Sequence, residues 1–150
     1  MDISNKTFVV VGTGKSGVAA AELLLRHAKK VYLYDGNEAL DVAAFRKQHQ
    51  SLNAVELILG TLPAEIETTL DIAVLSPGVP LDIPVVEQMK AQGICIWGEI
   101  ELAYVLGKGT VVAITGTNGK TTTTTLVGQI MARHFAKVQV VGNIGIPYTS

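Results

Sequence analysis

The chain has 150 residues, of which 48% are hydrophobic and 17% charged, and its 12 basic and 13 acidic side chains leave a net charge of −1. This composition, with a single cysteine, excludes a disordered tail, a collagen-like chain and a disulfide-stapled mini-protein. The balanced charge provides none of the basic surface by which proteins bind nucleic acid. Because no apolar run reaches the roughly 18 residues of a membrane span and MDISNK lacks an export-signal pattern, we expect a cytoplasmic protein without a membrane partner.

Short β-branched apolar runs alternate with amphipathic segments over the first two thirds of the chain. Strands are predicted at residues 7–11, 31–34, 55–59, 72–75 and 94–97. Helices are predicted at 16–27, 38–48 and 83–91, the last with Asp82 as N-cap and Pro84 in its first turn, and a short helical segment at 63–69. This alternation is typical of an α/β fold with a doubly wound parallel sheet.

A second unit is predicted to begin after Gly98, which gives one domain at residues 1–98 and the beginning of another at 99–150. GEIELAYVLGKG predicts a short helix, and strand 110–115, a glycine-rich loop, helix 120–135 and strand 138–141 follow. Two parallel strands and one helix cannot cover both faces of their own sheet. We therefore expect a truncated second unit, the N-terminal part of a longer protein, and a chain that self-associates through residues beyond Gly109 or leaves them mobile.

The first glycine motif is GTGKSG, in which Gly12, Gly14 and Gly17 follow a predicted strand and precede a predicted helix. Such glycines allow a tight turn, approach of a ligand to the backbone and close helix packing, and the helix N-terminus attracts phosphate. Asp35 ends the next strand, where a Rossmann carboxylate usually contacts ribose. Taken alone, these features predict a Rossmann-like domain that binds NAD, and the alternative is a tight turn without a ligand.

The second glycine motif, GTNGKT, resembles the loop that holds nucleotide phosphates in P-loop ATPases, although Ile114 stands where the complete pattern has glycine. The lysine can reach the β- and γ-phosphates of ATP, and the threonine hydroxyl can coordinate Mg²⁺. A polar, hydroxyl-rich helix start would explain one or two threonines but not the whole motif. The predicted ATP-binding residues are Gly116, Thr117, Asn118, Gly119, Lys120, Thr121 and Thr122, with Lys120 and Thr121 catalytic and Thr121 as the Mg²⁺ ligand.

Two further loops, SPGVP and GNIG, follow predicted strands, where ligands bind in doubly wound sheets. From the residues alone, a Pro-Gly turn is favoured over a ligand loop at residues 76–80, and Asn143 is by default a turn residue.

The remaining polar and aromatic residues are assigned structural roles. We expect Cys95 to be buried, Trp97 and Tyr104 to pack at the domain junction, and the following side chains to be solvated: His27, His49, His134, Glu99 and Glu101.

The glycine unit ending in Asp35, SPGVP, GTNGKTT and GNIGIP occur in an order and spacing that resemble the Mur ligase family, over essentially the whole chain. Within that family they are most similar to members that add D-glutamate to UDP-N-acetylmuramoyl-L-alanine in peptidoglycan precursor synthesis. Members that add L-alanine usually have His where this chain has Asn118.

The resemblance implies that the Rossmann-like domain binds the UDP of the muramoyl precursor, not a dinucleotide. Asp35 would accept a hydrogen bond from the uracil ring, and Asn143 would touch the diphosphate from the second domain. Some relatives stack an Arg on uracil at position 37, which Asn37 cannot supply. The implied UDP-binding residues are Gly14, Lys15, Ser16, Gly17, Asp35, Gly36, Ser76, Pro77, Gly78 and Asn143.

The resemblance also implies ATP-dependent amide ligation with Mg²⁺. Lys120 would neutralise charge on the γ-phosphoryl group, an acyl phosphate would form, and the amine of D-glutamate would attack it. The other catalytic parts of the family would follow Ser150, so this chain alone is expected to bind its small-molecule substrates and not to catalyse. The alternatives are another Mur ligase, an NAD-binding oxidoreductase fragment and a nucleotide-binding fragment without enzymatic activity.

Overall fold

The computed structural model describes residues 1–142, 146, 148 and 149, and its centre is one parallel sheet. The strands lie in the order β3-β2-β1-β4-β5, so β1 has a parallel neighbour on each side. Their bounds are Thr7–Val11 for β1, Lys30–Asp35 for β2, Glu56–Leu59 for β3, Ile72–Leu75 for β4 and Cys95–Gly98 for β5. All five predicted strands are confirmed, with ends that differ from the predicted ones by at most one residue.

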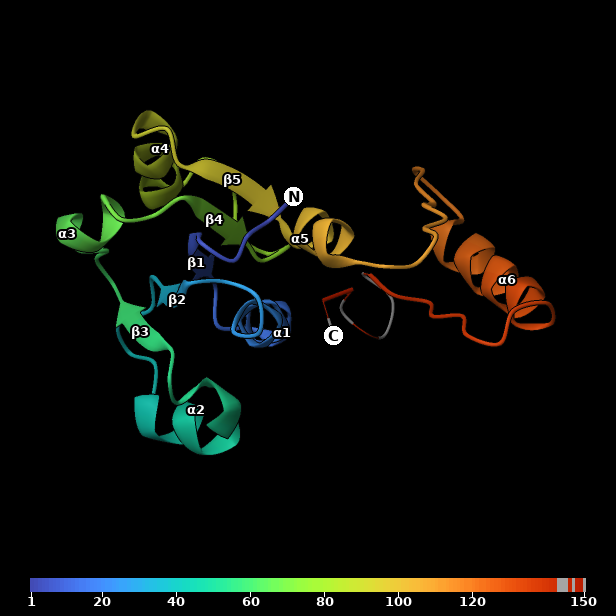
Figure 1. The fold of residues 1–150 in the computed structure, drawn as a ribbon, viewed down its shortest axis with the longest axis horizontal. Coiled ribbons are helices and arrows are strands. Elements are labelled where there is room, and N and C mark those ends of the chain that lie inside the picture. Colours follow the sequence, from blue (N-terminus) through green and yellow to red (C-terminus); the bar gives the residue numbers. More distant parts are fainter. Residues whose placement is uncertain (143–145, 147, 150) are drawn as a thin grey trace.

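Helices cover both faces of this sheet (Figure 1). Alternate residues of β1 point to opposite faces: Phe8 and Val10 pack with α1, α2 and α5, and Val9 and Val11 pack with the side of α3 and α4. The predicted doubly wound α/β fold is confirmed. The helices are α1 (Lys15–Leu24), α2 (Val42–Gln48), the 3₁₀ turn η1 (Gln50–Leu52), α3 (Ala64–Glu67), α4 (Pro84–Ala91), α5 (Glu99–Leu106) and α6 (Lys120–Ala132).

The structure corrects the predicted starts of two helices. The predicted start of α2 at residue 38 is wrong, because the Asp41 side chain accepts a 3.0 Å bond from the amide of Ala44 and so caps a helix that begins at Val42. The predicted cap at Asp82 is also wrong. Ile83 occupies the cap position without a side-chain bond, and Pro84 is the first residue of α4, as predicted.

The second unit differs more from its prediction. Helix α6 begins at Lys120, as predicted, but residues 110–115 form no strand, and residues 138–141 contribute only an isolated bridge from Val141 to Ile146. A strand exists only through pairing with a neighbour, and the described residues of this unit offer no ladder. Figure 1 shows α6 apart from the sheet, whereas α5 packs back on it through Leu102.

Several predicted environments are corrected. Cys95 is exposed, because β5 is an edge strand and Cys95 is its first residue. Trp97 is buried against Phe8, with ring centroids 5.9 Å apart, but Tyr104 is 67% exposed and does not pack as predicted. Glu99 is buried instead of solvated, and its Oε1 accepts a 3.2 Å bond from the Thr149 hydroxyl.

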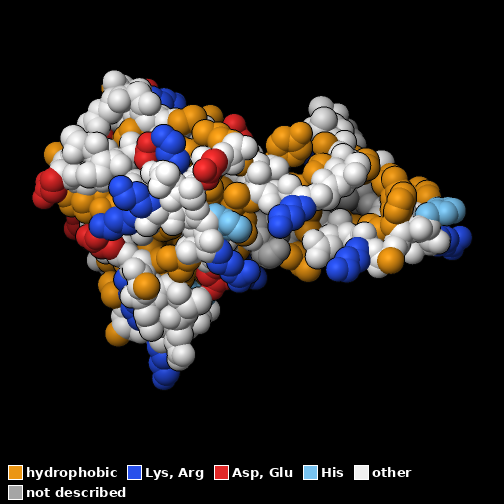
Figure 2. Space-filling model, in the orientation of Figure 1, with side chains coloured by type: hydrophobic (Ala, Val, Ile, Leu, Met, Phe, Trp, Pro, Cys, Tyr) orange, Lys and Arg blue, Asp and Glu red, His pale blue; other side chains and the backbone are white. Residues whose placement is uncertain are grey.

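The predicted exposure of His27, His134 and Glu101 is confirmed, and His49 is half-buried beside Phe45. Figure 2 shows apolar side chains at the surface of the α6 region as well as over the sheet domain. Within the described residues, no helix combines the length and apolar character needed to cross a membrane.

Candidate functional site

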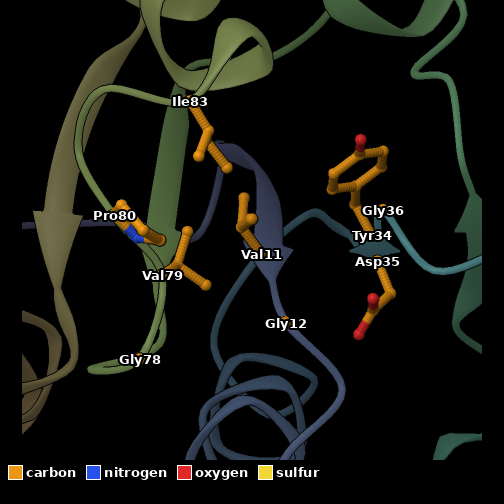
Figure 3. A pocket seen from close by; sticks show the side chains of 9 residues that line it. All are labelled: Val11, Gly12, Tyr34, Asp35, Gly36, Gly78, Val79, Pro80 and Ile83. Carbon is orange, nitrogen blue, oxygen red and sulfur yellow. The ribbon is translucent and has the colours of Figure 1, made fainter.

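A pocket of about 210 Å³ lies where the direction of the strand order reverses, between β1 and β4. In doubly wound sheets this crevice at the carboxyl ends of the strands is the usual ligand site. Three segments converge on it: the end of β1, the end of β2 and the loop from β4 to α4 (Figure 3). Its lining residues are Val11, Gly12, Tyr34, Asp35, Gly36, Gly78, Val79, Pro80 and Ile83.

The glycine loop beside the pocket is closely packed at two of its three glycines. Gly12 has φ of +104°, and its amide donates a 2.7 Å bond to the carbonyl of Tyr34. A Cβ on Gly17 would lie 1.9 Å from the Gly12 carbonyl oxygen, so α1 packs directly on the turn. A Cβ on Gly14, by contrast, would have no neighbour within 4 Å. Gly12 therefore forms the turn, Gly17 allows α1 to pack on it, and Gly14 leaves its backbone open.

Asp35 accepts three hydrogen bonds, two of them from this loop. Its Oδ2 accepts bonds from the amide of Thr13 at 3.0 Å and from the Thr13 hydroxyl at 2.5 Å, and its Oδ1 accepts one from the amide of Asn37 at 3.0 Å. Partial burial acts to raise the pKa of the Asp35 carboxyl, but the hydrogen bonds from Thr13 and Asn37 outweigh it and lower the pKa below its ordinary value. The pocket therefore holds a fixed, ionised carboxylate at neutral pH.

Tyr34 forms the neighbouring wall of the pocket. Its hydroxyl donates a 2.6 Å bond to the carbonyl of Gly60, which fixes the ring across the ends of β2 and β3. Burial, followed by the charge of Asp35, raises the pKa of the Tyr34 phenol. The ring consequently remains neutral and offers an apolar surface to the pocket, pointing away from the Asp35 carboxylate (Figure 3).

The loop after β4 closes the opposite side. The amide of Val79 donates a 2.9 Å bond to the carbonyl of Ser76, so SPGV forms a turn, and this turn also places Gly78, Val79 and Pro80 on the pocket. The turn and the ligand-loop interpretations are thus compatible. The Ser76 hydroxyl is buried without a hydrogen-bond partner in the described part of the chain, and it faces Gly12 and Gly17.

The structure brings together part of the predicted UDP-binding set. Asp35, Gly36 and Gly78 line the pocket. The predicted residues that do not line it are Gly14, Lys15, Ser16 and Gly17 at the start of α1, Ser76 behind the glycine turn, and the exposed Pro77. Asn143 lies outside the described residues. Sequence reasoning missed Tyr34 and Thr13, although a hydroxyl between two glycines opposite a strand-end Asp is a signal that could have identified Thr13.

The second glycine loop forms a helix start of the predicted kind. Gly116 and Gly119 have φ of +153° and +74°, which other residues rarely adopt, and α6 begins immediately at Lys120. The Lys120 ammonium donates to the carbonyls of Gly116 and Thr117, so its side chain folds back over the loop. All of the predicted ATP-binding residues, 116–122, are exposed and adjacent here.

The loop can bind an anion through backbone amides and the Lys120 charge. The Thr121 hydroxyl at the start of α6 is the kind of oxygen donor that Mg²⁺ accepts. The described residues contain no cluster of three or more His, Cys, Asp or Glu side chains suited to a metal ion.

Comparison with known proteins places this arrangement in a family. A model described as the MurD-like N-terminal domain of Mur ligases matches residues 6–98, and the Mur ligase middle domain matches residues 114–150. UDP-N-acetylmuramoylalanine–D-glutamate ligase of Lachnospira eligens is 52% identical over 149 residues, which cover 99% of this chain and 33% of that protein. The protein of the same name from Lachnoclostridium phytofermentans is 49% identical over the same extent. The chain thus spans about a third of the length of these curated relatives.

A solved structure has a related fold. The pseudomurein peptide ligase type C from Methanothermus fervidus aligns with 86% of this chain and 26% of its own length, with a TM-score of 0.53 and 24% identity. At that identity the likeness shows the fold alone. The match to the MurD-like model covers more than half of the chain, and this chain therefore belongs to the Mur ligase family.

Proposed function

We propose that this chain is part of an ATP-dependent ligase that adds D-glutamate to UDP-N-acetylmuramoyl-L-alanine in peptidoglycan precursor synthesis. In this proposal residues 1–98 form the UDP-binding domain and residues 99–150 begin the ATP-binding domain, with α5 packed back on the first. The observation that carries the proposal is the pocket with an ionised Asp35 at the strand reversal, in a chain that also holds the GTNGKT loop. The names of the curated relatives support the same activity.

The pocket supports binding of the uridine end of the substrate. Asp35 offers an acceptor to a ring N–H, and the neutral Tyr34 ring offers an apolar wall. The start of α1 lies beside the open Gly14, where backbone amides favour a diphosphate. Lys15, Ser16, Ser76, Pro77 and Asn143 are proposed to complete the contacts with the diphosphate and sugar.

The second loop supports ATP binding and phosphoryl transfer. Lys120 would leave the carbonyls of Gly116 and Thr117 and neutralise charge on the transferred γ-phosphoryl group. Mg²⁺ held through the Thr121 hydroxyl would supply charge neutralisation between the phosphates. The L-alanine carboxylate of the muramoyl substrate would attack the γ-phosphorus with loss of ADP to give an acyl phosphate. The D-glutamate amine would then displace phosphate and form the amide.

The proposal can be tested in a chimera in which this chain replaces the matching 149 residues of the Lachnospira eligens relative, 52% identical to it. Formation of ADP in the chimera should require both UDP-N-acetylmuramoyl-L-alanine and D-glutamate, with turnover within about tenfold of that of the unaltered relative. The unaltered relative is the control for the assay. A folded chimera that releases ADP equally well without D-glutamate, or with L-alanine in its place, would contradict the proposal.

A further inference from the structure

Thr13 is in closer contact with the pocket carboxylate than any other residue. Both of its donors, the backbone amide and the hydroxyl, bond to one oxygen of Asp35, at 3.0 Å and 2.5 Å. The other oxygen accepts one bond, from the amide of Asn37 at 3.0 Å. Thr13 stands between Gly12 and Gly14 in the loop that precedes α1, so this contact joins that loop to the carboxylate that lines the pocket.

The contact limits what Asp35 can still bind. An ionised carboxylate has about four acceptor positions, two on each oxygen. The two donors of Thr13 fill Oδ2, and Asn37 takes one position on Oδ1. One acceptor position therefore remains, on Oδ1. Because Asp35 lines the cavity, this position is the one left for a ligand. A ligand can therefore use a single N–H or O–H donor here, whereas a ribose diol that donates from two hydroxyls has only one acceptor to share.

We propose that Thr13 is a specificity-determining residue, which occupies Oδ2 of Asp35 and thereby selects a ligand with one donor, such as the imide of a uracil ring, over a ribose diol. This inference rests on the proposed function, because it assumes that the pocket takes the uridine end of a nucleotide. Thr13 acts through Asp35 and is a positioning residue. Its hydroxyl also helps to keep the carboxylate ionised, since it is the largest of the contacts that lower the pKa of Asp35.

The decisive variants are Thr13→Val, which removes the hydroxyl at nearly constant shape, and Thr13→Ser, which keeps it. Affinities are measured by calorimetry on the whole chain for UDP, which has the single ring N–H, and for ADP-ribose, which has ribose diols but no ring N–H. We expect wild type and Thr13→Ser to prefer UDP, and Thr13→Val to lose about tenfold of that preference, because a freed position on Oδ2 admits the second hydroxyl of the diol. Thr13→Ala serves in place of Thr13→Val if the valine variant does not fold.

A second measurement is independent of any ligand. Titration of the Asp35 carboxyl carbon by NMR should show a higher pKa in Thr13→Val than in wild type and a wild-type value in Thr13→Ser. An unchanged preference for UDP in Thr13→Val, despite a raised pKa, would mean that Thr13 is merely structural and would overturn the inference. A wild-type chain that prefers ADP-ribose would overturn the proposed function as well, so the two failures are distinguishable.

Discussion

Gly17 and Gly12 approach each other more closely than any side chain would permit, because a Cβ on Gly17 would lie 1.9 Å from the Gly12 carbonyl oxygen. Gly17→Ala must therefore move α1 away from the turn. We expect the free energy of unfolding to fall by about 1–3 kcal/mol or more, as measured by urea denaturation. Unchanged stability would mean that the turn is looser than this contact implies.

Gly14→Ala is the matched substitution in the same motif, and it should not disturb the fold. A Cβ at Gly14 would meet no atom within 4 Å, and the backbone there is extended. Stability should remain within about 0.5 kcal/mol of wild type. If a diphosphate approaches the Gly14 backbone, the methyl group should weaken UDP binding at least tenfold in calorimetry. Full retention of UDP affinity would show that the ligand does not use this loop.

Lys120→Ala should separate catalysis from folding. Lys120 is exposed and contacts only loop carbonyls in the described structure, so the melting temperature of the chimera should change by no more than a few degrees. Turnover should fall by orders of magnitude, because the γ-phosphoryl charge loses its partner. Lys108→Ala, at another exposed lysine, should leave both unchanged. Retention of more than about a tenth of the turnover, a barrier change under ~1.4 kcal/mol, would reject the role of Lys120.

The apolar side of α6 predicts association of the chain with itself. Leu126 and Ile130 are four residues apart on the same side of the helix and are 56% and 50% exposed. Exposed apolar patches of this kind favour contact with another chain. Light scattering after size exclusion should show a mass that rises with concentration, and Leu126→Glu should reduce it. Gln129→Glu adds the same charge without removing apolar surface and should have little effect, and a strictly monomeric wild type would refute the prediction.

Asp71 should make stability depend on pH in the acid range. The Lys6 ammonium, 2.7 Å away, and the amide of Thr7 lower the pKa of the Asp71 carboxyl below 3.8. A lowered folded pKa gives stabilisation that is present above the unfolded value and is lost as pH falls through the folded one. Asp71→Asn should cost up to about 1 kcal/mol at pH 7, since the pair is partly exposed, and less at pH 3.

Urea denaturation of wild type and Asp71→Asn at pH 7 and at pH 3 gives the loss in free energy of unfolding at each pH. Asp82→Asn is the control, because the Asp82 side chain has no hydrogen bond among the described residues and is exposed. An Asp71→Asn cost that is equal at pH 7 and pH 3 would mean that the carboxylate charge plays no part.

Local pattern was sufficient to predict the sheet. Continuous β-branched runs such as Val9, Val10 and Val11 are typical of interior strands of a parallel sheet, and the helix between β1 and β2 follows from the glycine turn. The same reasoning failed at residues 110–115 and 138–141, which have strand composition but no paired neighbour in the described structure. Strand propensity is realised only through partners, which local sequence does not specify.

The site was predictable in part for a similar reason. Asp35 ends β2 and Gly78 follows β4, and parallel strands bring their carboxyl ends together, so the place of both residues at one pocket could be inferred. The contact of Thr13 with Asp35 spans 22 residues and depends on the direction of one hydroxyl. Glu99 was misjudged because its surroundings include a distant part of the chain: it is buried and accepts a hydrogen bond from Thr149, 50 residues away. Such long-range contacts follow from the fold and not from a local motif.

We propose that the pocket at the β1–β4 reversal takes the UDP end of a muramoyl precursor and not a dinucleotide. Calorimetric titration of the 150-residue chain with UDP-N-acetylmuramoyl-L-alanine and, separately, with NAD tests it most directly. We expect saturable binding of the UDP compound and weaker or undetectable binding of NAD. Binding of NAD that is equal or tighter would contradict it.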